Sequence, residues 1–219
     1  MLDSTRRLLA HFVREQDVLL GGGTALASRW RHRKSVDIDL FVDPSTYRRN
    51  ILARSEECLD RLRQLGFLRL AAVGEEGIGL QHGGGKVDIV ACFPVTGHDR
   101  SRDVVAGTGI AVETNAEILA KKLHRRILGH GRILPRDLYD LAYARRFEPE
   151  ALEAAWDARR VADPDVLVAA LGSFSPGWMD RHEERVEGAR YPELLSEAVD
   201  GLLSDALARF AGRRARRGA

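Results

Sequence analysis

The stretch GGGTALASRWRHRKSVDIDLFVD, residues 21–43, decides the fold of this protein. It begins with three glycines, continues through apolar positions at helical spacing, and ends where apolar and polar residues alternate. Glycine permits a tight turn, and such alternation is typical of a strand with one buried face. We therefore predict a short buried strand over 18–20, a glycine turn, a helix, and a second strand over 35–42.

Two carboxylates, Asp37 and Asp39, stand two residues apart on the predicted second strand. Because successive side chains of a strand point to opposite faces, these two would project to the same side. Like charges so close repel unless a cation lies between them or one takes up a proton, and hard oxygen ligands suit Mg²⁺ or Mn²⁺. Asp88, in the segment KVDIV, is a candidate third ligand. The pattern predicts a metal site, although a DxD pair alone more often caps a turn or makes a surface ion pair.

The glycines before the helix offer a place for a phosphate group. Glycine lets backbone amides approach a phosphate closely, and the N-terminus of the following helix favours negative charge. We predict Gly22, Gly23 and Thr24 as nucleotide-binding residues. The Walker A pattern of P-loop NTPases is not met, because the later Gly85-Lys86 is followed by valine and not by Ser or Thr.

Strand and helix patterns divide the chain near residue 110. Before that point, segments with helical spacing alternate with strand-like segments; after it, the pattern is helical. The helical segments are 3–16, 47–65, 116–128, 136–146, 149–160 and 191–210, and the further strand-like segments are 67–73, 78–81 and 87–93. We predict an α/β (α+β) core with a mixed sheet over 1–110 and a mostly helical domain over 111–219, whose basic tail at about 212–219 is expected to be disordered.

The composition is that of an ordinary globular protein. The 34 basic residues nearly balance the 32 acidic ones, so the net charge of +2 does not by itself indicate a nucleic-acid partner. Cys58 and Cys92 form no CxxC pair, which argues against a disulfide framework or a thiolate zinc site and favours a reducing cytoplasm. No apolar stretch is long enough to span a bilayer. We expect a cytoplasmic protein with no membrane partner.

The stretch over 21–43 resembles the opening signature of the AbiEii/AbiGii toxin family. This family is a branch of the DNA-polymerase-β-like nucleotidyltransferases and occurs in abortive-infection and toxin–antitoxin systems. A second similar segment is EILAKKLHRRILGHGRILPRDLYDL, residues 117–141, in which a lysine precedes a leucine and an Arg-Asp pair begins a later helix. Together the two segments bracket residues 18–141.

The resemblance implies metal binding and catalysis by Asp37 and Asp39 and further catalytic roles for Lys122 and Asp137. A lysine ammonium can neutralise a triphosphate as a point charge, so Lys122 is also a nucleotide-binding candidate. Asp137 could orient either Lys122 or the nucleotide. The helical domain would then contribute to the active-site cleft. Asp140, three residues after Asp137, is either a second functional carboxylate or a charge on the helix surface.

The activity implied by the resemblance is transfer of a nucleoside monophosphate from an NTP to an acceptor hydroxyl, with release of pyrophosphate and Mg²⁺ or Mn²⁺ as cofactor. Some members of the family add nucleotides to the 3′ end of tRNA, so tRNA is the expected acceptor and a cognate antitoxin an expected partner. The basic residues His32, Arg33 and Lys34 either meet phosphate or RNA or simply close the helix before the catalytic strand.

Three other functions fit parts of the sequence. The same metal site would serve transfer to a protein side chain or to an antibiotic. Arg125 and His130 have the Arg-x4-His spacing of some helical RNase toxins, although so short a motif often arises by chance. A scaffold or antitoxin-like protein could keep the fold without catalysis, but the intact catalytic candidates argue against it.

Overall fold

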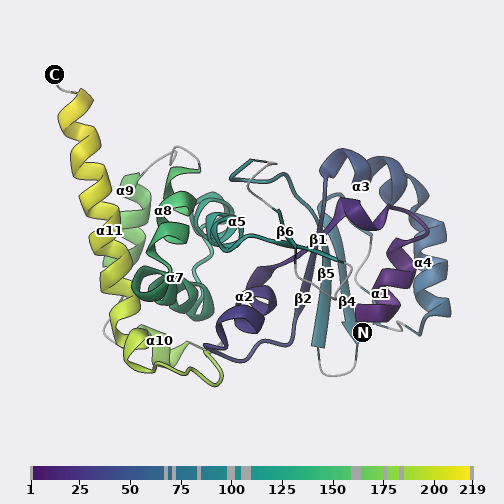
Figure 1. Cartoon of the computed structure of the whole chain (residues 1–219), viewed down its shortest axis with the longest axis horizontal. Helices are drawn as coiled ribbons and strands as arrows, with labels where there is room; N and C mark the ends of the chain where they lie inside the picture. The colour runs from purple at the N-terminus through teal and green to yellow at the C-terminus, as the bar shows by residue number, and fades with distance from the viewer. Residues whose placement is uncertain are drawn as a thin grey trace. The chain divides into compact units, whose positions relative to one another are not determined.

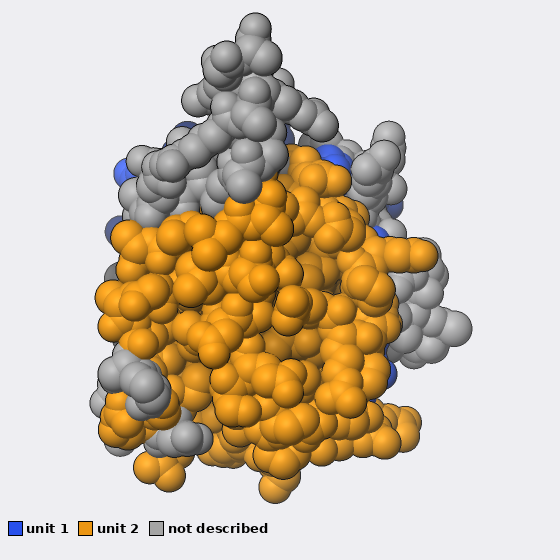
Figure 2. Space-filling model, turned by 90° about the vertical axis from the view of Figure 1, so that its left-hand side faces the viewer, with its two compact units in different colours: residues 1–30, 35–114 blue, residues 31–34, 115–219 orange. Residues whose placement is uncertain are grey.

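The computed structural model describes residues 2–66, 69–70, 73–82, 85–97, 102–104, 110–158, 164–174, 177–182 and 185–217. The chain divides into two compact units, coloured separately in Figure 2. Unit 1 comprises residues 1–30 and 35–114, and unit 2 comprises residues 31–34 and 115–219. The change of unit at residue 114 lies close to the predicted boundary at 110, whereas the assignment of 31–34 to unit 2 has no counterpart in the sequence patterns.

Unit 1 is built on a mixed sheet, as predicted. Within the described residues, seven strands pair in the order β3-β4-β5-β2-β1-β7-β6. They are β1 (Val18–Gly21), β2 (Ile38–Val42), β3 (Arg69–Leu70), β4 (Gly77–His82), β5 (Gly85–Ala91), β6 (Arg102–Val104) and β7 (Ala111–Glu113). Strand β1 runs antiparallel to β2 and parallel to β7, and β2 runs parallel to β5. Strands β6 and β7, of three residues each, were not predicted.

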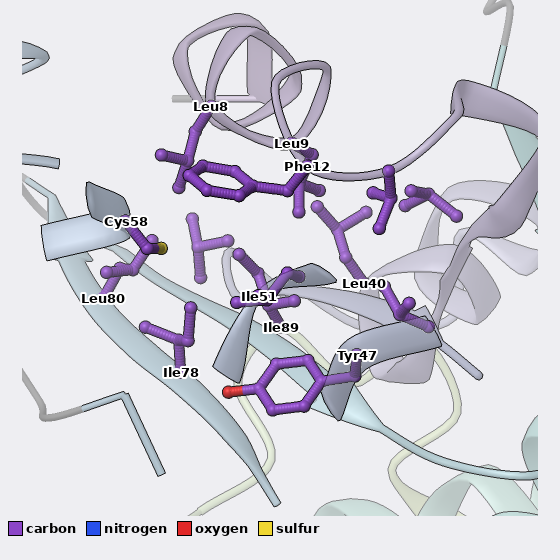
Figure 3. Close-up of a cluster of buried hydrophobic side chains, with 14 of the residues drawn as sticks. Leu8, Leu9, Phe12, Leu40, Tyr47, Ile51, Cys58, Ile78, Leu80 and Ile89 are labelled. Atoms are coloured by element: carbon purple, nitrogen blue, oxygen red, sulfur yellow. The ribbon is translucent and has the colours of Figure 1, made fainter. Parts of the chain in front are cut away.

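The core of unit 1 lies on one face of this sheet (Figure 3). Helices α1 (Leu2–Leu9), α3 (Pro44–Asn50) and α4 (Ser55–Gln64) lie on that side, and α2 (Gly22–Trp30) lies on the other (Figure 1). The strands contribute alternate residues to the core, namely Leu40, Val42, Ile78, Leu80, Val87 and Ile89. Because side chains alternate along a strand, the residues next to them, including Asp39 and Asp88, fall on the opposite face.

Two predicted helices of unit 1 have different limits. The helix predicted over 3–16 ends at Leu9. The one predicted over 47–65 begins earlier, at Pro44, because the Asp43 carboxylate accepts hydrogen bonds from the amides of Ser45 (2.9 Å) and Thr46 (3.3 Å) and thereby caps the helix. A short 3₁₀ turn, η2 (Leu52–Arg54), then separates α3 from α4.

Unit 2 is helical, in agreement with the predicted fold class. Its elements are α5 (Asn115–Ala120), the π-helix η4 (Lys121–Ile127), α6 (Leu128–His130), α7 (Pro135–Phe147), α8 (Pro149–Asp157), α9 (Pro164–Gly172), α10 (Trp178–Arg181) and α11 (Glu193–Arg217). The tail expected to be disordered from 212 is instead helical as far as Arg217. Alanine and arginine are strong helix formers and no proline interrupts them, so α11 can continue.

Both cysteines, Cys58 and Cys92, are free thiols, and both are buried. Among the described helices, none combines the length and the apolar character needed to cross a bilayer.

Candidate active site

The DxD pair lies at the beginning of strand β2. Asp39 is the second residue of β2, Asp37 precedes its first residue, and both are half-buried. The strand starts later than predicted: its pairing with β1 begins at Asp39, opposite Gly21, and its pairing with β5 begins at Ile38, opposite Val87. The hydroxyl of Thr24 donates to the carbonyl of Asp37 and lies 2.9 Å from Oγ of Ser35. The first turn of α2 therefore holds the segment that leads into β2.

Gly22 lies directly against the carboxylate of Asp39. Its φ angle is +67°, and a Cβ atom at this position would stand 1.8 Å from Oδ2 of Asp39. Only glycine satisfies both the left-handed backbone and this close approach. The predicted nucleotide-binding residues Gly22, Gly23 and Thr24 are the first three residues of α2. The first amides of a helix lack intrahelical acceptors and favour negative charge, so a phosphate group would be stabilised here.

Asp39 belongs to a row of residues that crosses four strands. It pairs with Gly21 of β1 on one side and with Asp88 of β5 on the other. The register of β1 with β7, continued by one residue, puts Glu113 beside Gly21. Directly opposite residues of a sheet point to the same face. Asp39, Asp88 and Glu113 therefore share the face opposite the core. In this row Gly21 lies between Asp39 and Glu113.

Glu113 is a residue of this face that the sequence patterns did not single out. Its side chain is 0% exposed. It reaches over Gly21, since a Cβ atom on Gly21 would lie 2.2 Å from Oε2 of Glu113. Arg29 of α2 donates to the carbonyl of Glu113 at 2.7 Å. The short apolar run before Glu113 is the signal that could have marked β7, but only strand pairing brings this carboxylate into the row of Asp39.

Asp88 shares the face of Asp39 but makes an ion pair within its own strand. Nζ of Lys86 lies 2.8 Å from Oδ2 of Asp88, whose side chain is 26% exposed. Among the described residues, no group of three His, Cys, Asp or Glu side chains is arranged to hold a metal ion. The chemistry of the donors nevertheless suits Mg²⁺ or Mn²⁺, because Asp37 and Asp39 offer hard carboxylate oxygens. The carboxylate of Asp39 lies beside a helix N-terminus that can receive phosphate.

Lys122 belongs to unit 2, where it is buried between two carboxylates. Only 4% of this residue is exposed, so it does not lie on a solvated helix face. Its Nζ makes an ion pair with Asp137 and lies 3.0 Å from Oδ2 of Asp140. Nη1 of Arg126 lies 2.9 Å from both carboxylate oxygens of Asp137. Lys122 and Arg126, one helical turn apart, thus converge on Asp137.

Asp140 is fully buried and is not a charge on the helix surface. Arg33 donates to it through Nε at 2.6 Å and Nη2 at 2.9 Å, and Nε2 of His32 lies 2.7 Å from Oδ1. Burial alone would raise the pKa of Asp140, but the charges of Lys122 and Arg33 outweigh it and hold this pKa well below its usual range. Burial and charge compete in the same way at Asp137, whose pKa is also lowered.

These contacts correct one interpretation of the basic segment before β2. His32 and Arg33 are buried and committed to Asp140, so they do not form an open surface for phosphate or RNA. Lys34 is exposed. Local sequence could not distinguish these cases, because the partner of Arg33 lies 107 residues further along the chain.

Comparison with known proteins agrees with the earlier resemblance. The model of the family described as "Nucleotidyl transferase AbiEii toxin, Type IV TA system" matches residues 6–214. A search of curated proteins finds no match. Similar solved structures include JHP933 from Helicobacter pylori, with 15% identity, 99% of each chain covered and a TM-score of 0.48. A putative nucleotidyltransferase from H. pylori shows 16% identity over 94% of this chain and 96% of that one, with a TM-score of 0.48.

The antibiotic-resistance factor ANT(2'')-Ia is also similar, with 15% identity over 99% of this chain and 95% of that one and a TM-score of 0.39. The family match spans nearly the whole chain and includes both segments on which the resemblance rested. The protein is therefore a nucleotidyltransferase and belongs to the AbiEii toxin family of type IV toxin–antitoxin systems.

Proposed function

We propose that this protein transfers a nucleoside monophosphate from an NTP to the 3′ end of a tRNA in the cytoplasm, and that this reaction is its toxic activity. The observation that carries the proposal is the contact between Asp39 and Gly22 at the start of α2. A carboxylate able to hold a cation thereby lies beside helix amides able to hold phosphate. Both are needed where a triphosphate is bound and cleaved.

In the proposed reaction, the acceptor hydroxyl forms a bond to the α-phosphorus of the NTP while the bond from that phosphorus to pyrophosphate breaks. Asp37 and Asp39, with Asp88 as a third candidate, would hold Mg²⁺ or Mn²⁺, which when bound supplies positive charge for the phosphates. The amides of Gly22, Gly23 and Thr24 would bind phosphate oxygens. The hydroxyl proton passes to a carboxylate of the same face.

Lys122 and Asp137 complete the proposed machinery. Lys122 is proposed to offset negative charge of the triphosphate, and Asp137 to orient its ammonium group. Their direct ion pair supports the second role. Because Lys122 is buried, any charge that it offers is fixed by its carboxylate partners and not by solvent.

A macromolecular acceptor is favoured because the family consists of toxins of type IV systems, which would also have a cognate antitoxin as a partner. The experiment incubates the purified protein with Mg²⁺ and each α-labelled NTP in turn, together with total tRNA, total cellular protein or an aminoglycoside. We expect label on tRNA, lost with EDTA and lost when the tRNA 3′ end has been oxidised with periodate. Label on protein or on the antibiotic would contradict the acceptor, and no label in any mixture would contradict nucleotide transfer.

A further inference from the structure

Residues Arg31–Lys34 interrupt unit 1 immediately before the catalytic segment. The chain leaves unit 1 after Trp30, the last residue of α2, and returns to it at Ser35. Arg31 has a left-handed backbone with φ of +52° and is the only non-glycine residue of this kind among those described. A backbone conformation that is unfavourable for arginine persists only where the surrounding contacts impose it.

Unit 2 holds these four residues by their backbone. The amide of Arg190 donates to the carbonyl of His32 at 2.8 Å, and the amide of Lys34 donates to the carbonyl of Glu187 at 2.8 Å. The hydroxyl of Tyr139 donates to the same carbonyl of His32 at 3.1 Å. These bonds fix the path of the segment on both sides of Arg33.

Asp140 holds the same segment by its side chains. Its carboxylate accepts two hydrogen bonds from Arg33 and contacts the ring of His32. The ring of His32 also stacks on Tyr139, with centroids 5.5 Å apart and an angle of 4° between planes. A two-point contact between guanidinium and carboxylate fixes orientation as well as distance.

The segment ends three residues before Asp37. Three residues span at most about 10 Å when fully extended, so a fixed Lys34 limits where Asp37 can lie. Asp140 also lies 3.0 Å from Nζ of Lys122. The buried carboxylate of Asp140 therefore contacts residues of the 31–34 segment, which precedes the DxD pair, and also Lys122, the lysine proposed to act on the triphosphate.

We propose that Asp140 is a positioning residue of the transfer reaction. It holds His32 and Arg33, fixes the course of residues 31–34, which lead into the DxD segment, and also holds Lys122. The catalytic consequence rests on the proposed function, whereas the anchoring of the segment does not. The two consequences are therefore measured separately.

The first measurement is amide hydrogen exchange in Asp140→Asn, which preserves size and removes the charge. The matched control is Asp205→Asn, which removes a carboxylate of unit 2 that pairs with Arg145 at 3.2 Å and is distant in sequence from the segment. We expect exchange over 31–37 and 187–190 to accelerate by about tenfold or more in Asp140→Asn alone, with α11 unchanged. A folded Asp140→Asn protein with wild-type exchange over these residues would overturn the anchoring.

The second measurement is steady-state transfer to tRNA. We expect kcat to fall by about tenfold or more in Asp140→Asn while KM for the NTP stays within about twofold, because misplaced groups affect the transition state more than binding. Faster amide exchange in Asp140→Asn together with an unchanged kcat would overturn the positioning role. Absence of transfer by the wild-type protein would instead contradict the proposed function and leave the exchange result to decide the anchoring.

If Asp140→Asn does not fold, Tyr139→Phe provides the test. This change removes the hydroxyl that donates to the His32 carbonyl and accepts from the amide of Tyr191 at 3.1 Å, and it leaves every charge in place. We expect faster exchange over 31–37 and a lower kcat, each smaller in size than for Asp140→Asn. Wild-type exchange and wild-type kcat in Tyr139→Phe would overturn the proposal.

Discussion

Gly22 and Asp39 lie so close together that a Cβ atom on Gly22 would stand 1.8 Å from Oδ2 of Asp39. The glycine is the first residue of α2 and the aspartate the second of β2. This contact brings a carboxylate to the positive end of a helix. It also leaves no room for a side chain at position 22.

The first prediction compares Gly22→Ala with Gly66→Ala. Both glycines have a left-handed backbone, with φ of +67° and +80°, but among the described residues beyond its chain neighbours nothing lies within 4 Å of a Cβ atom at position 66. Gly66→Ala should therefore lower the free energy of unfolding only by the backbone penalty of about 1 kcal/mol, and it should retain transfer activity. Gly22→Ala should lose more stability and nearly all transfer, because Asp39 must move. Chemical denaturation and a transfer assay check this, and equal behaviour of the two variants would contradict it.

The second prediction concerns the charge of Asp39. Asp39→Ala and Asp39→Asn should fold but lose transfer by about a hundredfold or more, because a ligand of the proposed cation is removed from a crowded anionic site. Asp60→Asn is the control, since it removes an exposed carboxylate of unit 1 that pairs with Arg63 at 2.6 Å. Transfer at the wild-type rate by a folded Asp39 variant would exclude the proposed role.

The third prediction tests Glu113, the buried carboxylate beside Gly21. Glu113→Gln keeps the shape of the side chain and removes its charge. If Glu113 acts with Asp39, kcat should fall by about tenfold or more, and the Mg²⁺ concentration required for half-maximal rate should change. Glu117→Gln serves as the control, because Glu117 is also 0% exposed but belongs to unit 2. Equal losses in both variants would indicate a general effect of buried charge.

The fourth prediction concerns the ion pairs of Lys122. Lys122→Met should lower the free energy of unfolding by about 3 kcal/mol, near the lower end for a broken buried pair, because Arg126 and Arg33 still face the two carboxylates. Lys121→Met should cost less, since Nζ of Lys121 lies 3.6 Å from Glu117. Lys122→Arg should recover part of the stability but little transfer, because a planar guanidinium does not replace a compact ammonium. Wild-type transfer by Lys122→Ala would remove this lysine from the proposed machinery.

The fifth prediction follows from the lowered pKa of Asp140. A carboxylate whose pKa is lower in the folded protein than in the unfolded chain stabilises the fold above the unfolded pKa of about 4 and loses this contribution as the pH falls toward the folded pKa. The free energy of unfolding should therefore drop below about pH 4. The difference between the wild-type protein and Asp140→Asn should shrink over the same range, which denaturation at pH 7, 5, 4 and 3 measures. A difference that stays constant down to pH 3 would contradict this linkage.

Much of unit 1 could be predicted because its signals are local. Alternation of apolar and polar residues marks β2. It puts the side chains of Asp39 and Leu40 on opposite faces of the sheet, whichever strands lie alongside. The glycines indicate a place where the backbone and a phosphate group can approach closely. Helical spacing of apolar residues predicts most of the helices of unit 2. The same local rules failed for β6 and β7, because three residues are too few for a period to appear.

The sequence by itself determined the nucleotidyltransferase signature: a glycine-led helix, a DxD strand and a mostly helical second half. Only the tertiary structure decided that residues 31–34 belong to unit 2, that Arg33 meets Asp140, and that Glu113 joins the row of Asp39. Arg33 and Asp140 are 107 residues apart. Local periodicity reports which face of an element is buried, but not which distant group it meets. That choice follows from the packing of whole helices and the order of strands, in which a buried charge must find its partner.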